Sequence, residues 1–324
     1  MIKSVFITGA NGFIGRALAD RFRKLGATVR GMDLAADAAG DVIAGNLTQP
    51  DGWRAHAAGC ELFVNTAAVV SNNAPWDLYR QVSVHGVRNA LKVAIDGGAR
   101  RFMHYSSCAA FGWDTPEIVD ETWPTVIGED FRYGVAKGAS EHLVLAAHAS
   151  GAIPCTIVRP TDVYGPGSRA WLIEPLKLVR ARTLVLPGHG NGVFSPVYID
   201  DLLDGTVLAC TAPQGAGQIF TIGGGYTVSC REFFGHHWRW AGRKGEVPGV
   251  SLPLALRIAG AIQWFNRKRG KNDETCPDSV LMLARRGGYS IEKARRLLGF
   301  EPKVSFEEGM RRSEQWLREV GELR

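Results

Sequence analysis

The 324-residue sequence lacks paired cysteines and closely spaced metal ligands. Its six cysteines lie far apart and form no CxxC pair, so we expect a reduced, cytoplasmic setting and no disulfide framework. The eight histidines show no metal-ligand spacing, and the adjacent His236 and His237 would point in different directions on a helix. We therefore expect no metal site.

The sequence shows no internal repeat. Because it opens on a strand pattern, we expect no secretory leader. The net charge of +6 is spread thinly and forms no basic stripe interleaved with aromatics, so we expect no nucleic-acid partner. Residues 252–269 are apolar and then basic, but fall short of the roughly 20 apolar residues of a spanning helix. This segment resembles an interfacial anchor, yet a helix with a solvated basic end is favoured over membrane-surface contact.

Strand-like and helix-like segments alternate through the first half of the sequence. The patterns predict strands at Lys3–Thr8, Thr28–Asp33, Glu61–Asn65, Arg101–Ser106 and Cys155–Val158, and helices at Ile14–Leu25, Trp76–Ile95 and Tyr133–Ala149. Such alternation predicts right-handed crossovers and a doubly wound α/β fold, with a parallel sheet covered on both faces.

Beyond Pro160 the pattern loosens into turns rich in glycine and proline. Helices are predicted near Trp171–Arg182, Leu252–Phe265 and Phe306–Val320, while Val197–Cys210 and Gln218–Ile222 still indicate sheet and crossover. We expect residues 1–165 to form the first domain, with elements of about 196–224 returning to it. Residues 166–195 and 225–324 are expected to form a smaller lobe.

The stretch TGANGFIG lies between the first predicted strand and the first predicted helix. Gly9, Gly12 and Gly15 suit a tight turn, a close approach of backbone to a pyrophosphate, and close packing of helix on sheet. The helix N-terminus then offers unpaired N–H groups to the phosphates. This stretch predicts a dinucleotide-binding loop.

Asp33 ends the second predicted strand. Its carboxylate can accept both ribose hydroxyls of an adenosine and repels a 2′-phosphate, which favours NAD over NADP. Arg16 and Arg30 are near enough in sequence to keep NADP as the less favoured alternative.

The pentapeptide YGVAK places Tyr133 and Lys137 one helical turn apart. A phenol titrates at about 10, so a neighbouring ammonium, helped by oxidised nicotinamide, must lower its pKa before it can act as a base. Lys137 can supply that charge. Ser106 and Ser107 follow a predicted strand at the edge where doubly wound folds bind ligands. Ser107 can hydrogen-bond a substrate oxygen, whereas Ser106 also suits a turn cap.

Together these motifs resemble the extended short-chain dehydrogenase/reductase family, also called the NAD-dependent epimerase/dehydratase family. Further landmarks follow in the family order: NTAA at 65–68, RPTDVYGPG at 159–167, VYIDD at 197–201 and KARRLLGFEP at 293–302. The resemblance implies a dinucleotide-binding Rossmann domain and a C-terminal substrate-binding lobe.

The resemblance also implies roles for individual residues. Tyr133 matches the family's acid/base, Lys137 its partner and Ser107 its catalytic serine. The implied cofactor-binding residues are Gly9, Asn11, Gly12, Phe13, Ile14, Gly15, Asp33, Asn46, Leu47, Thr66, Ala67, Ala68, Tyr133, Lys137, Pro160 and Val163. Asn46 stands where the family often has an aspartate beside the adenine, and its amide can accept the same hydrogen bond less strongly.

Departures from the family pattern concern the substrate. Ser83 stands where the family usually has asparagine, and Cys108 and Ala109 replace the adjacent acidic residues of the dehydratase branch, which disfavours dehydration. Val193 or Phe194 stands near the arginine with which nucleotide-sugar epimerases grip a diphosphate. In the lobe, Arg169 or Arg180 could still bind the diphosphate of a nucleotide sugar.

We therefore expect an NAD-dependent oxidoreductase that moves a hydride between nicotinamide and a secondary alcohol or ketone of a small or bulky apolar substrate. The resemblance is strongest to hydroxysteroid dehydrogenase-like and ketone reductase-like branches. A nucleotide-sugar epimerase with tightly bound NAD is the alternative, and a sensor that binds NAD without turnover is a third class. The resemblance further implies a homodimer that packs residues 76–95 and 133–149 as a four-helix bundle.

Overall fold

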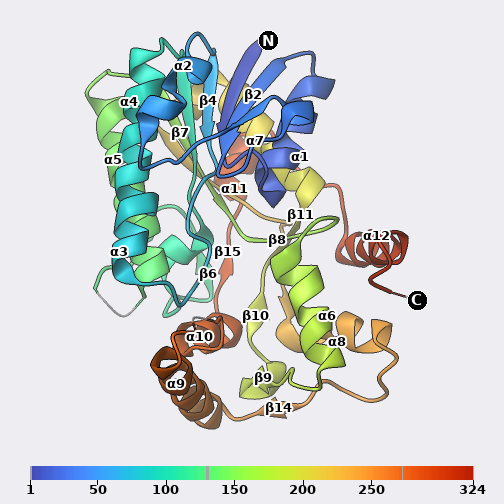
Figure 1. Ribbon diagram of the computed structural model, residues 1–324. Coiled ribbons are helices and arrows are strands. Elements are labelled where there is room, and N and C mark those ends of the chain that lie inside the picture. The colour runs from blue at the N-terminus through green and yellow to red at the C-terminus, as the bar shows by residue number, and fades with distance from the viewer. Residues whose placement is uncertain (1, 129–130, 272, 324) are drawn as a thin grey trace.

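A seven-stranded parallel sheet forms the centre of the computed structural model, which describes residues 2–128, 131–271 and 273–323 (Figure 1). Its strand order is β12-β7-β5-β4-β1-β2-β3. The strands are β1 (Ser4–Thr8), β2 (Thr28–Asp33), β3 (Val42–Ala44), β4 (Leu62–Asn65), β5 (Arg101–Tyr105), β7 (Cys155–Pro160) and β12 (Gln218–Ile222). The order reverses beside β1, so the predicted doubly wound fold is confirmed.

Alternate residues of each strand face opposite helical layers. On β1, Val5 and Ile7 belong to one apolar cluster and Phe6 to another. The first cluster lies under α1 (Phe13–Lys24), α7 (Ile199–Thr211) and α11 (Glu292–Leu298), and the second under α2 (Arg54–Ala57), α4 (Gly86–Asp96) and α5 (Arg132–Ala149). Burial on both faces explains why the central strands β1 and β4 consist mostly of apolar residues.

The helix predicted from Trp76 to Ile95 is divided into three segments. α3 (Trp76–Leu78) leads into the π-helical segment η3 (Tyr79–His85), and α4 follows. A π-turn inserts an extra residue that a period of 3.6 does not reveal. Ser83 lies in this segment, is buried, and accepts a hydrogen bond at Oγ from the Val69 N–H (3.2 Å). Ser83 thus holds the loop that follows β4.

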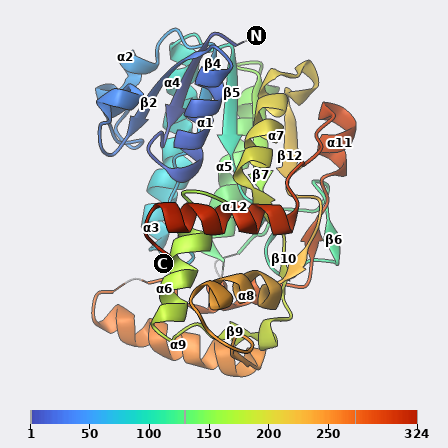
Figure 2. The same ribbon diagram turned by 90° about the vertical axis from the view of Figure 1, so that its right-hand side faces the viewer.

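A smaller group of elements lies below the sheet in Figure 1. It contains α6 (Glu174–Arg180), α8 (Cys230–Trp240), α9 (Leu252–Lys268), α10 (Pro277–Ala284), β9 (Leu186–Pro187), β10 (Val193–Phe194), β13 (Val228–Ser229) and β14 (Gly249–Val250). Figure 1 and Figure 2 show α12 (Phe306–Glu319) on one flank of the molecule, at the height where this group meets the sheet. The sequence patterns did not predict α8, α10 or α11.

Short strand pairs connect the two regions. β8 (Asp162–Tyr164) pairs with β11 (Pro196–Tyr198), and β6 (Ile118–Val119) pairs with β15 (Gly288–Tyr289). α11 packs against α7 and β12, so part of the range assigned to the lobe also returns to the sheet. The division at residue 165 stays a prediction.

The cysteines, the possible metal ligands and the hydropathy of the helices can be described for the residues that the structure covers. All six cysteines are buried free thiols. Within the described ranges, no three His, Cys, Asp or Glu side chains gather closely enough to hold a metal ion. Among the same residues, none of the helices has the length and hydropathy needed to cross a bilayer.

Candidate functional site

The glycine loop after β1 leaves no room for side chains at Gly9 and Gly15. Gly9 has a φ of +73°, and a Cβ there would lie 2.7 Å from Thr66 Oγ1. A Cβ on Gly15 would lie 2.1 Å from the carbonyl oxygen of Gly9. α1 begins after Gly12 without a side-chain cap, so the N–H groups of its first turn can bind an anion. This cradle fits the pyrophosphate of a dinucleotide.

Asp33 ends β2 at the rim of the same loop. Its Oδ2 accepts a hydrogen bond from the Asn11 N–H (2.8 Å), and its Oδ1 accepts one from the Leu34 N–H (2.7 Å). The Asn11 side chain donates to the Ala35 carbonyl oxygen (2.7 Å). These bonds fix the carboxylate next to the N-terminus of α1.

The two arginines that left NADP as an alternative cofactor contact other groups of the protein. Arg16 forms an ion pair with Asp37 (3.9 Å), and Arg30 donates to the carbonyl oxygen of Ala58 (2.8 Å). Both contacts reduce the case for a 2′-phosphate site at this edge.

Other predicted cofactor residues follow strand ends along the same edge. Thr66, Ala67 and Ala68 come directly after β4, Pro160 ends β7, and Val163 lies in β8. Phe13 and Ile14 open α1 and pack against the apolar core. Carboxyl ends of neighbouring parallel strands meet at one edge, so these residues lie around the crevice where doubly wound folds bind ligands. Their contacts with a cofactor stay a prediction.

Asn46 and Leu47 have structural roles in the chain itself. Asn46 Oδ1 accepts hydrogen bonds from the N–H and the hydroxyl of Thr48 (both 2.9 Å). Leu47 is buried, and a Cβ on Gly86 would lie 2.7 Å from its Cδ2. Their predicted place beside the adenine stays a prediction.

Ser107, Tyr133 and Lys137 come together beyond the end of β5. Ser107 opens the turn after β5, and its side chain lies close enough to that of Tyr133 to lower the pKa of the phenol. Lys137 Nζ lies 5.9 Å from the centroid of the Tyr133 ring and donates to the Tyr105 carbonyl oxygen (2.9 Å). Thus α5 presents the base and the cation to the serine at the sheet edge.

Burial shifts the two titratable groups of this trio in opposite directions. It raises the pKa of Tyr133, and the nearby Ser107 side chain opposes the rise. Burial also lowers the pKa of Lys137 to about 8, against the pull of the Glu141 carboxylate. At neutral pH the chain alone therefore holds Tyr133 as a phenol and Lys137 mostly as an ammonium. The chain's own charges therefore do not lower the pKa of Tyr133 in the way that the sequence led us to expect.

A buried ion pair, which the sequence analysis did not anticipate, lies one turn beyond Lys137. The Glu141 carboxylate accepts hydrogen bonds from Arg159 Nε (2.8 Å) and Nη2 (2.6 Å), and both side chains are at most 2% exposed. The Arg159 guanidinium also lies 4.3 Å from the centroid of the Phe111 ring. The four-residue spacing of Tyr133, Lys137 and Glu141 was the available signal, because it places all three on one helix face.

A second buried network crosses the sheet beneath the site. Thr8 Oγ1 donates to Asn65 Oδ1 (2.6 Å), and Asn65 Nδ2 faces His104 Nδ1 (3.1 Å). His104 Nε2 faces Ser140 Oγ (2.9 Å), whose own proton goes to the Lys137 carbonyl oxygen (2.7 Å). His104 must therefore donate from Nε2 and accept at Nδ1. Burial holds the pKa of His104 well below its usual value, which keeps the ring neutral.

An aromatic cluster occupies the position expected for the diphosphate arginine of epimerases. Phe194 is buried, with its ring centroid 4.1 Å from Phe233 and 4.7 Å from Trp171. Near it lies Arg285, which the sequence analysis did not single out. This buried arginine forms an ion pair with Asp162, so its charge is already neutralised.

The two lobe arginines suggested as substitutes lie in ion pairs on the surface. Arg169 Nε is 2.8 Å from Glu174 Oε1, and Arg180 Nη1 is 3.1 Å from Glu322 Oε2. Neither contact points to a diphosphate site.

Several known proteins are similar to this chain along most of its length. The 4-hydroxy-2-methyl-3-oxo-4-farnesyl-3,4-dihydroquinoline-1-oxide ketoreductase of Stigmatella aurantiaca is 26% identical over 315 residues, covering 94% of each chain. A 3-beta-hydroxysteroid dehydrogenase of Mycolicibacterium neoaurum is 28% identical and covers 94% of this chain and 89% of its own. A UDP-glucose 4-epimerase of Vibrio cholerae is 29% identical and covers 74% of this chain and 70% of its own.

Solved structures share the fold over the whole chain. The epimerase Mth375 of Methanothermobacter thermautotrophicus superposes with a TM-score of 0.80 at 22% identity, covering 99% of this chain and 93% of its own. The model of the NAD-dependent epimerase/dehydratase family matches residues 5–223, which include the glycine loop, Ser107, Tyr133 and Lys137. The chain therefore belongs to the NAD-dependent epimerase/dehydratase family, and NAD is its cofactor.

Proposed function

We propose that this chain is an NAD-dependent oxidoreductase that interconverts a secondary alcohol and a ketone on an apolar substrate. The observation that carries the proposal is the convergence of Ser107, Tyr133 and Lys137 at the carboxyl edge of the sheet. Bound NAD supplies the acceptor or donor of the hydride. The protein supplies the proton and orients the substrate oxygen.

In ketone reduction, the Tyr133 phenol donates its proton to the substrate oxygen, and the Ser107 hydroxyl hydrogen-bonds the same oxygen. The Lys137 ammonium stabilises the phenolate that remains. Alcohol oxidation runs the same path backwards. Because burial raises the pKa of Tyr133, the protonated form needed for reduction predominates in the chain alone at neutral pH.

We assign cofactor binding to the residues at the carboxyl edge. Gly9, Gly12 and Gly15 and the first turn of α1 would hold the pyrophosphate, and Asp33 the adenosine ribose. Lys137 would bind the nicotinamide ribose. Asn46 and Leu47 would lie beside the adenine, and Thr66, Ala67, Ala68, Pro160 and Val163 would line the rest of the cofactor.

Two observations favour an apolar substrate. The ketoreductase and the hydroxysteroid dehydrogenase, which match along most of the chain, are named for a farnesylated quinoline and a steroid. In the lobe, Phe194 packs among aromatic rings where an epimerase would need a free arginine. An apolar pocket with few polar groups suits such ligands.

Replacing the acid/base residue tests the mechanism. The Tyr133→Phe variant removes the proton donor, so we expect kcat for a ketone substrate to fall about 10²- to 10⁴-fold with NAD binding retained. Tyr226→Phe, which removes a hydroxyl from a tyrosine outside the proposed site, is the matched control. Near-normal turnover by Tyr133→Phe on a verified substrate would refute the proposal.

A nucleotide-sugar epimerase is the second candidate, favoured by the match to UDP-glucose 4-epimerase. It would use the same three residues but retain its NAD and return the hydride to the opposite face. NAD that survives purification, together with turnover of UDP-sugars without net NADH formation, would favour this activity. Arg285 argues against it because its charge is paired with Asp162.

We also propose that the chain works as a cytoplasmic homodimer with a substrate lobe formed by residues 166–195 and 225–324. Six buried thiols suit a reducing compartment. On α4 and α5 a shallow hollow is lined by the apolar residues Leu91, Ile95, Leu143 and Ala147 and by the charged residues Arg88, Lys92 and Asp96. This surface suits the four-helix contact expected of a dimer.

A further inference from the structure

Helix α9 turns its large apolar side chains toward solvent. Leu254, Ile258, Ile262 and Phe265 recur at intervals of three or four residues and therefore share one helix face. With Trp264, these side chains are between 38% and 60% exposed. We define the α9 apolar stripe as Leu254, Ile258, Ile262, Trp264 and Phe265. Scattered apolar residues on a surface need no explanation, but a continuous stripe marks an interaction site.

The opposite face of α9 is anchored to the protein. Its buried residues are Ala255 and Ala259, and the helix packs against α10. Gln263 Nε2 donates to Asn73 Oδ1 (2.6 Å), and Asn266 donates its side-chain amide to Asp273. Small and polar residues thus face inward, and these contacts fix the stripe outward.

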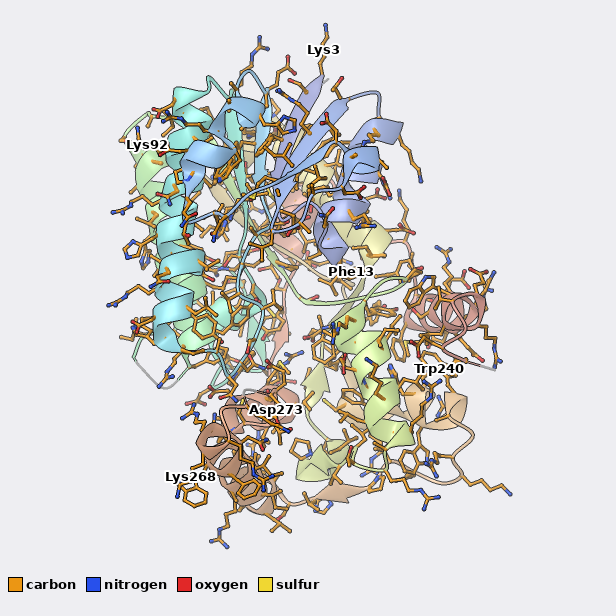
Figure 3. All side chains as sticks on the ribbon, viewed as in Figure 1. Lys3, Phe13, Lys92, Trp240, Lys268 and Asp273 are labelled. Atoms are coloured by element: carbon orange, nitrogen blue, oxygen red, sulfur yellow. The ribbon has the colours of Figure 1, made fainter. Side chains whose placement is uncertain are left out.

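The charged residues of α9 itself have a single sign. Residues 252–271 contain no aspartate or glutamate, and their basic residues are Arg257, Arg267, Lys268, Arg269 and Lys271. Lys268 Nζ lies 3.9 Å from the Trp264 ring centroid, and Arg269 Cζ lies 3.9 Å from that of Phe265. Cations therefore flank the apolar side chains at the C-terminal end of α9, where Figure 3 shows Lys268 at the outer edge of the molecule.

We propose that α9 docks flat on a membrane surface that contains anionic lipid. The stripe would enter the boundary between headgroups and acyl chains, while the basic residues bind lipid phosphates. This partner satisfies both the apolar area and the positive rim. A second copy of this chain does not, because symmetric contact through α9 would oppose two sets of five positive charges. The proposal is independent of the enzymatic activity.

Vesicle flotation of the full chain tests the proposal. We expect binding to vesicles of phosphatidylcholine mixed with phosphatidylglycerol, weak binding to phosphatidylcholine alone, and loss of binding at high salt. Removing two charges in Lys268→Gln/Arg269→Gln should lower partitioning about 30-fold, which corresponds to about 1 kcal/mol per charge. The variant Ile258→Gln/Phe265→Gln should lower partitioning at least about tenfold.

Matched variants make the result specific. Lys3→Gln/Lys24→Gln removes two exposed charges outside the lobe, with Lys3 at the end of the molecule opposite Lys268 (Figure 3), and Leu178→Gln removes an exposed leucine from α6. Both should bind vesicles like the unaltered chain. Failure of the unaltered chain to bind anionic vesicles would overturn the proposal. So would a fall in oligomeric mass on Ile258→Gln/Phe265→Gln, because the stripe would then be a protein interface.

Discussion

The charge state of Lys137 depends on a neighbour that the sequence analysis did not single out. Burial alone lowers its pKa, and Glu141 raises it again to about 8. The ammonium is present below that pH and is lost as the pH rises through it. We therefore expect the rate of ketone reduction to fall above a pH of about 8.

Glu141→Gln removes the opposing carboxylate and leaves the charge of Arg159 unpaired. Both changes lower the pKa of Lys137, so the falling limb of the pH–rate profile should move to lower pH. Breaking a buried ion pair also costs about 3–5 kcal/mol of stability. Glu319→Gln, at the exposed end of α12, is the control for both the pH–rate profile and the free energy of unfolding. An unmoved limb in a folded Glu141→Gln protein would contradict this role.

Gly15 tests the phosphate cradle directly. In Gly15→Ala the new Cβ would lie 2.1 Å from the Gly9 carbonyl oxygen, so the loop must shift away from its binding geometry. We expect NAD affinity, measured by calorimetry, to fall at least about tenfold. Gly260→Ala is the matched control, because nothing lies within 4 Å of its added Cβ and alanine favours helices. Equal NAD affinity in the two variants would argue against the loop as the phosphate site.

At the scale of elements, one histidine links three strands of the sheet to α5. His104→Leu would leave Asn65 Nδ2 without its acceptor and Ser140 Oγ without its donor, so we expect a loss of about 2–4 kcal/mol in the free energy of unfolding, measured with denaturant. His85→Leu, at an exposed position on η3, should change it by less than about 0.5 kcal/mol.

The effect of His104→Leu on stability should also depend on pH. The folded pKa of His104 is depressed, so its contribution to stability is present above the unfolded value of 6.5 and decreases as the pH falls through that value. The stability gap between the unaltered chain and His104→Leu should therefore narrow in acid. A constant gap would show that His104 is not held neutral.

The sequence predicted elements whose local pattern matches their final environment. β1, β2 and β12 begin and end within one residue of their predicted limits, because glycines within two residues of an end of each strand mark its boundary. α8 and α10 were not predicted, because their apolar residues contact several parts of the lobe and do not recur at one clear helical interval. η3 was hidden because one extra residue per turn leaves composition unchanged.

The proposed trio was identifiable because Tyr133, Lys137 and Ser107 belong to short, ordered motifs. The partners that support it were not, because Glu141 meets Arg159 and Asp162 meets Arg285 only after the chain has folded. Arg285 lies 123 residues beyond Asp162, and no local pattern connects them. Long-range ion pairs of this kind leave little trace in one sequence.

At the scale of the whole molecule, the shallow hollow on α4 and α5 carries the prediction of a homodimer. Introducing charge there with Ile95→Arg/Leu143→Arg should halve the mass measured by light scattering, because burying unpaired charge is costly. Val320→Arg, at an exposed apolar residue on another surface, should leave the mass unchanged. A monomeric mass for the unaltered chain at micromolar concentration would rule out the dimer.

The hydrogen bond between Asn73 and Gln263 joins α9 to the loop that follows β4, the same loop in which Val69 packs near Tyr133. If α9 rests on lipid, a water-insoluble ketone would meet the enzyme by lateral diffusion within a leaflet. Its apparent KM would then follow the mole fraction of ketone in the lipid phase, and diluting the bilayer with inert lipid would slow turnover at constant total substrate.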